Sequence, residues 1–114
     1  MNLTDWFLEY KDLQLKQAAL TPIIRAANER IWNLIDTGHF PTDSEYLAAR
    51  GDLSELYEVR WELYGRQSKH DALLKGLIDS VDMATYRKFH AELTAFNDEM
   101  EQKELNKEAK KNVA

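Results

Sequence analysis

The sequence contains no cysteine among its 114 residues. It therefore cannot form a disulfide scaffold, use a thiolate nucleophile or build a zinc finger, since each of these needs the Cys side chain. Glycine and proline are also scarce, with four and two residues, which is too few for a loop-rich sandwich or a linker-rich array. The longest stretch without a charge, residues 17–24, is far shorter than a membrane span. These absences favour one globular domain over residues 1–114.

Positive charge is not concentrated anywhere in the chain. The sequence has 15 Lys and Arg against 20 Asp and Glu, which gives a net charge of −5. Binding to a phosphate backbone depends on clustered cations, and the lysines that gather near the C-terminus have acidic neighbours. We therefore expect no nucleic-acid partner and no membrane partner. Because the N-terminus lacks the basic start of a secretory signal, we expect a cytoplasmic protein.

Apolar residues recur every three or four positions through the first third of the chain. This spacing predicts a helical seam of the coiled-coil type, which starts near Thr4 and Asp5 and stops at Gly38, a typical C-terminal glycine. Thr21 and Pro22 mark either a kink or a new start with Thr21 as its N-cap. Since the apolar seam keeps the same helical phase on both sides of Pro22, we favour two nearly collinear helical pieces. The seam consists of Leu3, Trp6, Tyr10, Leu13, Leu20, Ile24, Ala27, Ile31 and Leu34.

A second helix is predicted after a connector at residues 39–41. Thr42 and Glu45 have the spacing of a capping box, in which each side chain bonds the backbone of the other. Gly65 is a plausible end for this helix, and residues 68–71 can then cap a third helical unit.

The second half of the chain contains a further change of helical phase. The apolar stripes before and after residues 79–82 are out of phase, which predicts a bend or break there with Asp82 as a fresh N-cap. Beyond residue 100 the chain reads as a charged helical extension or tail, over about residues 101–114. The sequence thus predicts an all-α protein, an antiparallel bundle of three to four long helices with coiled-coil-like seams.

No spacing in the sequence matches a known catalytic motif. His39, His70 and His90 are isolated from one another, and we expect them to be surface or boundary residues rather than metal ligands. A nucleophile elbow, a phosphate-binding glycine loop and a zinc-binding helix motif are all missing. We expect no catalytic residue and no cofactor.

Two acidic pairs support one enzymatic alternative. Glu55 and Glu58 lie one helical turn apart, as do Asp79 and Asp82 in the next unit, and carboxylates are the ligands that Mg²⁺ prefers. The arrangement resembles the all-α nucleoside triphosphate pyrophosphatases of the MazG type, which use acidic pairs on adjacent helices. This resemblance implies a Mg²⁺ site at the four carboxylates and nucleotide hydrolysis. The sequence departs from the family at Asp79–Asp82, where the family needs a continuous helix. The other interpretation is a solvated charged face.

Aromatic residues give a second candidate site. The apolar stripe of the second helix is wider than one neighbouring helix needs, and two neighbouring helices could cover it. In the alternative interpretation, Tyr57, Trp61 and Tyr64 stay partly exposed as a binding patch, since Tyr, Trp and Arg dominate interface hot spots. Arg60 lies in the same stripe. Its guanidinium either bonds to a group within the chain, reaches solvent at the end of its long side chain, or stays unpaired until another protein binds.

The first helix carries a second apolar stripe opposite its seam. Leu8, Leu15, Ala19 and Ala26 fall close together around the helix, with Ile23 beside them. This stripe is either covered by the third unit or mates with a second copy or a target protein through helix packing.

The leading functional hypothesis is a non-enzymatic protein-binding regulator, inhibitor or adaptor that acts through its helix faces. A short, acidic, cysteine-free helical chain of this kind is typical of small inhibitors encoded by phages and plasmids. The partner-binding residues that we predict are Leu8, Leu15, Ala19, Ile23, Tyr57, Arg60, Trp61 and Tyr64. The alternatives are the Mg²⁺-dependent nucleotide pyrophosphohydrolase and a structural homo-oligomer, such as a homodimer.

Overall fold

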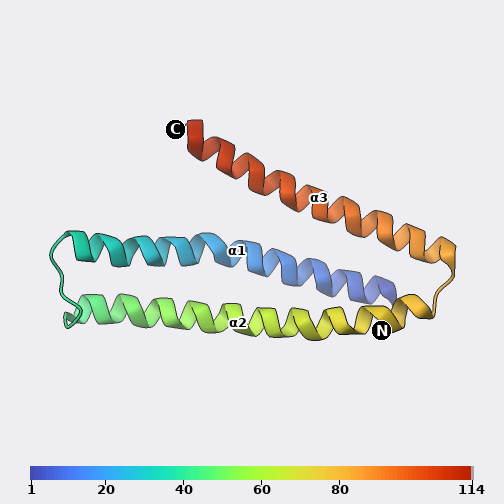
Figure 1. The fold of residues 1–114 in the computed structure, drawn as a ribbon, viewed down its shortest axis with the longest axis horizontal. Helices are drawn as coiled ribbons and strands as arrows, with labels where there is room; N and C mark the ends of the chain where they lie inside the picture. The colour runs from blue at the N-terminus through green and yellow to red at the C-terminus, as the bar shows by residue number, and fades with distance from the viewer. Residues whose placement is uncertain (114) are drawn as a thin grey trace. The chain divides into compact units, whose positions relative to one another are not determined.

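The computed structural model describes the backbone of residues 1–113 and the side chains of residues 1–107. It contains three α-helices, α1 (Leu3–Asp36), α2 (Ser44–Asp79) and α3 (Met83–Val113), of 34, 36 and 31 residues (Figure 1). No strand occurs among residues 1–113. The all-α prediction is confirmed, with three helices. None of the three combines the length and apolar character that would let it cross a membrane, within the part of the chain described.

A capping box formed by Asn2 and Asp5 starts α1 at Leu3. The backbone N–H of Asp5 donates to Oδ1 of Asn2 at 2.8 Å, and the backbone N–H of Asn2 donates to Oδ2 of Asp5 at 3.3 Å. Each side chain thus satisfies a backbone donor of the other, as a capping box does. The predicted start near Thr4 and Asp5 is confirmed to within one residue, since α1 begins at Leu3. The capping oxygen comes from Asn2, which was not predicted from the sequence.

Pro22 lies inside one continuous helix. A proline has no N–H to donate to the carbonyl four residues earlier, yet α1 runs through it from Leu3 to Asp36. The hydroxyl of Thr21 donates back to the carbonyl of Gln17 at 3.2 Å, so it does not cap a new helix. The predicted division into two helical pieces is therefore wrong. The seam residues on both sides of Pro22 are buried, and their packing holds the helix together.

The end of α1 is as predicted. Gly38 has a φ of 88°, the left-handed conformation that glycine adopts without steric cost. The N–H of His39 donates to the carbonyl of Leu34 at 2.9 Å, and that of Gly38 to Ile35 at 3.1 Å. These two bonds form a Schellman motif, which satisfies the last carbonyls of the helix.

The start of α2 lies one residue beyond the predicted cap. The carbonyl of Asp43 accepts the first helical bond from the N–H of Leu47 at 2.9 Å. Its side chain turns back to the connector, where Oδ2 accepts from the backbone N–H of Phe40 at 3.1 Å. Asp43 is therefore the N-cap residue, and the predicted box of Thr42 with Glu45 is wrong by one position.

The helix α2 does not end near Gly65. It continues through Gly65 and through the predicted caps at 68–71 to Asp79. A glycine in a helix costs only about 1 kcal/mol relative to alanine, whereas Leu63 and His70 are both buried on either side of it. The tertiary packing of these two residues outweighs the local stop signals.

The predicted break before the last helix is confirmed. The helix α2 ends at Asp79, and α3 begins at Met83. Oδ1 of Asp82 accepts from the backbone N–H of Thr85 at 2.7 Å, and the carbonyl of Asp82 accepts from Tyr86 at 3.0 Å. Asp82 is the N-cap of α3. The hydroxyl of Ser80 donates to the carbonyl of Leu77 at 2.9 Å and closes the end of α2.

Residues 12–72 form one compact unit, a helical hairpin. Within it α1 and α2 run antiparallel, because Gln17 pairs with Gln67 near one end and Arg30 pairs with Asp52 nearer the turn (Figure 1). The seam that the sequence predicts supplies one side of the core. The buried residues are Leu13, Leu20, Ile24 and Ile31 from α1, with Ala49, Leu53 and Leu63 from α2.

Residues 1–11 together with residues 73–114 form the second compact unit. Its core contains Leu3, Trp6 and Phe89, and Trp6 has only 2% of its surface exposed. The hydroxyl of Tyr10 donates to Oδ1 of Asn97 at 2.6 Å, which ties the start of α1 to α3. The predicted charged extension over about residues 101–114 lies partly outside the described side chains. Those of residues 101–107 are all exposed.

Candidate functional site

Four neighbouring residues of α2 form a surface that we call the aromatic patch. It consists of Tyr57, Arg60, Trp61 and Tyr64, whose spacing places them on one side of the helix. Trp61 has 73% of its surface exposed, and Tyr57 and Tyr64 are each about two-fifths exposed. The rings of Trp61 and Tyr64 meet edge to face with centroids 6.2 Å apart. Large aromatic side chains thus lie together outside the core, and two of them are in contact.

Arg60 is held by its own helix. Its Nε donates to the hydroxyl of Tyr64 at 2.8 Å, and its guanidinium carbon lies 5.5 Å from the centre of the Tyr64 ring. Of the interpretations that the sequence left open, the structure therefore shows an internal partner. That partner lies one turn along the same helix, so it cannot fix the register between helices. The guanidinium keeps its positive charge at the edge of the patch.

A second surface lies between α1 and α2 of the hairpin, and we call it the interhelical groove. It has a volume of about 370 Å³. Its floor and walls are apolar, and charged side chains lie along its rim. The lining residues are Lys16, Ala19, Leu20, Ile23, Val59, Glu62, Leu63 and Arg66.

The rim charges of the groove differ in their partners. Lys16 forms an ion pair with Asp12, with Nζ and Oδ2 2.8 Å apart. Glu62 and Arg66 lie one turn apart on α2, and neither has an ion pair within the described part of the chain. Both charges are thus available to a molecule that fills the groove.

The predicted outer stripe of α1 borders this groove. Leu15 and Ile23 have 50% and 52% of their surfaces exposed, and Ala19 between them is also exposed. Ala19 and Ile23 line the groove itself. Ala26 of the stripe is also exposed, whereas Leu8 belongs to the other compact unit and lines a different pocket.

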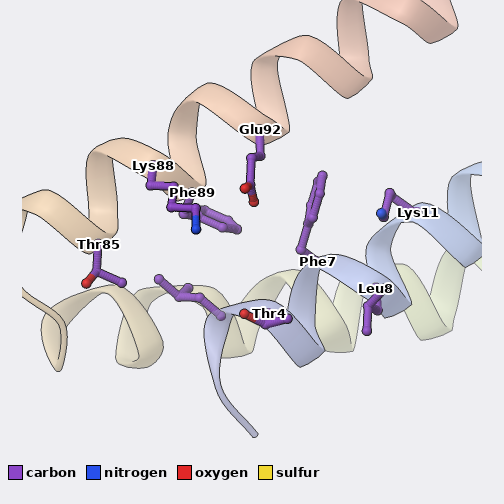
Figure 2. A pocket seen from close by; sticks show the side chains of 9 residues that line it. Thr4, Phe7, Leu8, Lys11, Thr85, Lys88, Phe89 and Glu92 are labelled. Atoms are coloured by element: carbon purple, nitrogen blue, oxygen red, sulfur yellow. The ribbon is translucent and has the colours of Figure 1, made fainter.

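That pocket lies within the unit formed by residues 1–11 and 73–114, between the start of α1 and α3 (Figure 2). It has a volume of about 550 Å³. The rings of Phe7 and Phe89 meet edge to face across it, with centroids 6.2 Å apart. Glu92 points from α3 toward the same space, and Nζ of Lys11 lies 4.7 Å from the centre of the Phe7 ring.

The chemistry of this pocket is mixed. Ring faces and the Leu8 side chain give it apolar surface, while Lys11, Lys88 and Glu92 bring two positive charges and one negative charge. Such a lining suits an apolar group with an anionic end. It offers a single carboxylate, which is too few for a dedicated metal site.

The four carboxylates of the enzymatic alternative are divided between the two compact units, with Glu55 and Glu58 in residues 12–72 and Asp79 and Asp82 in the other unit. Glu55, Glu58 and Asp79 all belong to α2, with Asp79 at its very end, several turns beyond Glu58. Asp82 caps α3, where the backbone N–H and the hydroxyl of Thr85 lower its pKa. The structure brings no three His, Asp or Glu side chains of the described residues into a group that could hold a metal ion.

The histidines occupy three different environments. Nδ1 of His39 lies 3.1 Å from Oδ2 of Asp43, where it closes the connector before α2. His90 is exposed beside the ring of Tyr86. His70 is only 3% exposed in the C-terminal third of α2, so the expectation of a surface or boundary residue is wrong for it. The sequence predicts a helix start at residues 68–71, whereas His70 lies inside the continuous α2 and is buried there.

Sequence reasoning missed the α2 side of the groove. Val59, Glu62 and Arg66 recur at three and four residues, which places them on one face of the helix. The available signal was the apolar Val59, which lies one turn before the buried Leu63 on α2. The groove itself could not be inferred, because it depends on the register between α1 and α2.

Comparison with known proteins adds no family. No model of a protein family matches the chain, and neither a curated protein nor a solved structure shows significant similarity to it.

Proposed function

We propose that this chain is a non-enzymatic, protein-binding regulator, inhibitor or adaptor that binds its target through the aromatic patch. The observation that carries the proposal is Trp61, a tryptophan with 73% of its surface exposed on the middle of a helix. An exposed tryptophan adds nothing to the hairpin core. Its burial against another protein would remove a large apolar area from water.

The surroundings of Trp61 have the composition of an interface hot spot. Tyr57 and Tyr64 flank it, and Arg60 supplies a positive charge, which matches the residue types that dominate binding energy. The edge-to-face contact with Tyr64 limits the rotation of the indole, so less conformational entropy is lost on binding.

The patch also indicates the chemistry of its target. Arg60 is bound to a neutral hydroxyl and not to a carboxylate. A target with an apolar pocket for Trp61 and an Asp or Glu beside it would satisfy the guanidinium by a charge-assisted bond. In this proposal the protein acts in the cytoplasm without a cofactor, and its helices form an antiparallel bundle with coiled-coil-like seams.

Affinity capture tests the proposal with three forms of the protein. The wild type is compared with Trp61→Ala and with Trp32→Ala, a matched control that removes a similarly exposed tryptophan from α1. We expect a stoichiometric heterologous partner to be retained by the wild type and by Trp32→Ala. Its affinity for Trp61→Ala should fall by roughly tenfold or more, since a hot-spot residue contributes about 2 kcal/mol.

Two results would contradict the proposal. One is capture of the same partner by Trp61→Ala with unchanged affinity. The other is the absence of any heterologous partner in lysates from several sources, which would favour a purely structural homo-oligomer.

A further inference from the structure

We infer that the interhelical groove binds a second copy of this chain, with the two α1 helices antiparallel and crossing at Ala19. The inference concerns a different surface from the aromatic patch and goes beyond the proposed function. It depends on the apolar surface and the charges of residues 12–72 alone.

The apolar residues of α1 are arranged symmetrically about Ala19. Leu15 lies four residues before it and Ile23 four residues after it, and all three are exposed. When two copies of α1 cross antiparallel at Ala19, Leu15 of each copy faces Ile23 of the other. The small Ala19 side chain at the centre lets the backbones approach, and residues four apart form the ridge that commonly packs between helices.

Two side-chain pairs between α1 and α2 show which residues of α2 lie beside Ala19. Gln17 is hydrogen-bonded to Gln67, and Arg30 pairs with Asp52. Residue numbers therefore rise along α1 as they fall along α2, and Ala19 lies at about the height of Tyr64. Glu62 and Arg66 flank that height on the groove side of α2.

The same twofold axis makes the charges complementary. It places Glu62 of one copy opposite Arg66 of the other, and the reverse pair forms at the same time. Neither residue has an ion pair within the described part of the single chain. Apolar and charged residues thus share one symmetry centre, as a self-complementary interface between identical subunits requires.

The other face-to-face arrangement is disfavoured by its charges. In that arrangement α1 of one copy would lie over α2 of the other copy without a shift along the helix axes. Lys16 of one copy would then lie next to Arg66 of the other, because the two residues are at the same level along the hairpin. Like charges placed next to each other in an interface repel and oppose association. The antiparallel crossing avoids this contact.

The dimer leaves the aromatic patch accessible. Trp61 follows Val59 by two residues, which places it about 200° around the helix from the groove wall. Each dimer would therefore present two aromatic patches, one from each copy.

Cysteine cross-linking tests the register directly, because the chain contains no cysteine. Ala19→Cys places two thiols at the crossing point, where a disulfide can form. Ala26→Cys is the matched control, an exposed alanine on the same face of the same helix. Its two thiols would be about 20 Å apart along the helix axes. Under mild oxidation we expect at least about tenfold more covalent dimer from Ala19→Cys. Equal yields, or no covalent dimer from Ala19→Cys, would overturn the inference.

Charge reversal is a second test that does not disturb the apolar surface. Glu62→Arg should weaken self-association by roughly tenfold, since it opposes two arginines. The double variant Glu62→Arg with Arg66→Glu restores the opposite charges and should recover an affinity within about threefold of the wild type. Failure of the double variant to recover would overturn the inference.

Light scattering of the intact protein completes the test. The wild type should show twice the mass of one chain, and Leu15→Asp with Ile23→Asp should show the mass of one chain at unchanged helical circular dichroism. Leu47→Asp, a leucine of similar exposure outside the groove, should remain dimeric. A monomeric wild type would overturn the inference, whereas capture of a partner by a monomeric variant would leave the proposed function standing.

Discussion

Arg60 and Tyr64 form a pair within one turn of α2, with the guanidinium Nε donating to the phenol oxygen at 2.8 Å. The pair is partly exposed, so we expect it to orient the binding patch and to contribute little to folding. Tyr64→Phe should change the free energy of unfolding by less than about 0.5 kcal/mol, as measured by urea denaturation. A loss well above 1 kcal/mol would instead show that the pair stabilises the hairpin.

Two leucines of α1 should differ sharply in their contributions to stability. Leu13 is fully buried in the hairpin core, while Leu15 is half exposed. Leu13→Ala should lower the free energy of unfolding by about 2–5 kcal/mol, because it loses buried apolar surface and leaves a cavity. Leu15→Ala, the control, should change it by less than about 1 kcal/mol in the monomer. Similar losses for both would contradict the assigned core.

Two glycines should respond to alanine with opposite signs. Gly38 has a φ of 88° at the end of α1, a conformation that strains any side chain. Gly38→Ala should destabilise the protein by about 1 kcal/mol. Gly51 lies within α2, and a methyl group there would contact nothing within 4 Å. Gly51→Ala should stabilise by about 1 kcal/mol. Thermal denaturation of both variants checks the two signs, and stabilisation by Gly38→Ala would contradict the Schellman motif.

The cap of α3 should make stability depend on acid pH. The N–H and hydroxyl of Thr85 hold the pKa of Asp82 below its ordinary value of 3.8. Because the folded pKa is lowered, the stabilisation is fully present above that ordinary value and is lost as the pH falls below about 4. Asp82→Asn cannot titrate, so its difference from the wild type should shrink below that pH. An unchanged difference in denaturation experiments down to pH 2 would contradict this cap.

The acidic pair of α2 should behave as a solvated surface. Glu55→Gln with Glu58→Gln should alter the free energy of unfolding by less than about 0.5 kcal/mol, since both residues are exposed. Mg²⁺ should leave the Tm of the wild type unchanged in differential scanning calorimetry. A rise with Mg²⁺ that the double variant abolishes would favour the hydrolase alternative.

The helices could be predicted to the extent that local spacing decides them. Every seam residue from Leu3 to Leu34 is buried or half-buried, because a 3.6-residue period identifies the core face without further information. Gly38 and Asp82 were also predicted correctly, since each acts through its own backbone geometry. The errors at Thr21 and Gly65 share one cause. Both residues carry local stop signals that tertiary packing on either side outweighs.

The surfaces were harder to predict than the helices. Tyr57, Trp61 and Tyr64 extend a stripe too wide for one neighbour, and periodicity cannot say whether a second neighbour covers it. The groove is lined jointly by Ile23 of α1 and Val59 of α2. Which residues of the two helices lie side by side is determined only by the antiparallel register. A single chain contains no local signal for such a register.

The core of the hairpin consists of one row of buried side chains from each helix, and this limits how far local unfolding can spread. Its buried side chains form successive layers along the hairpin from Leu13 to Ile31, and each layer packs only against the layers next to it. Unfolding that begins at the Gly38 turn therefore disrupts the packing around Ile31 first, reaches Leu20 and Leu63 later, and reaches Leu13 last. The groove and Trp61 lie beside Leu20 and Leu63. Local unfolding at the turn can therefore occur while both recognition surfaces keep their shape.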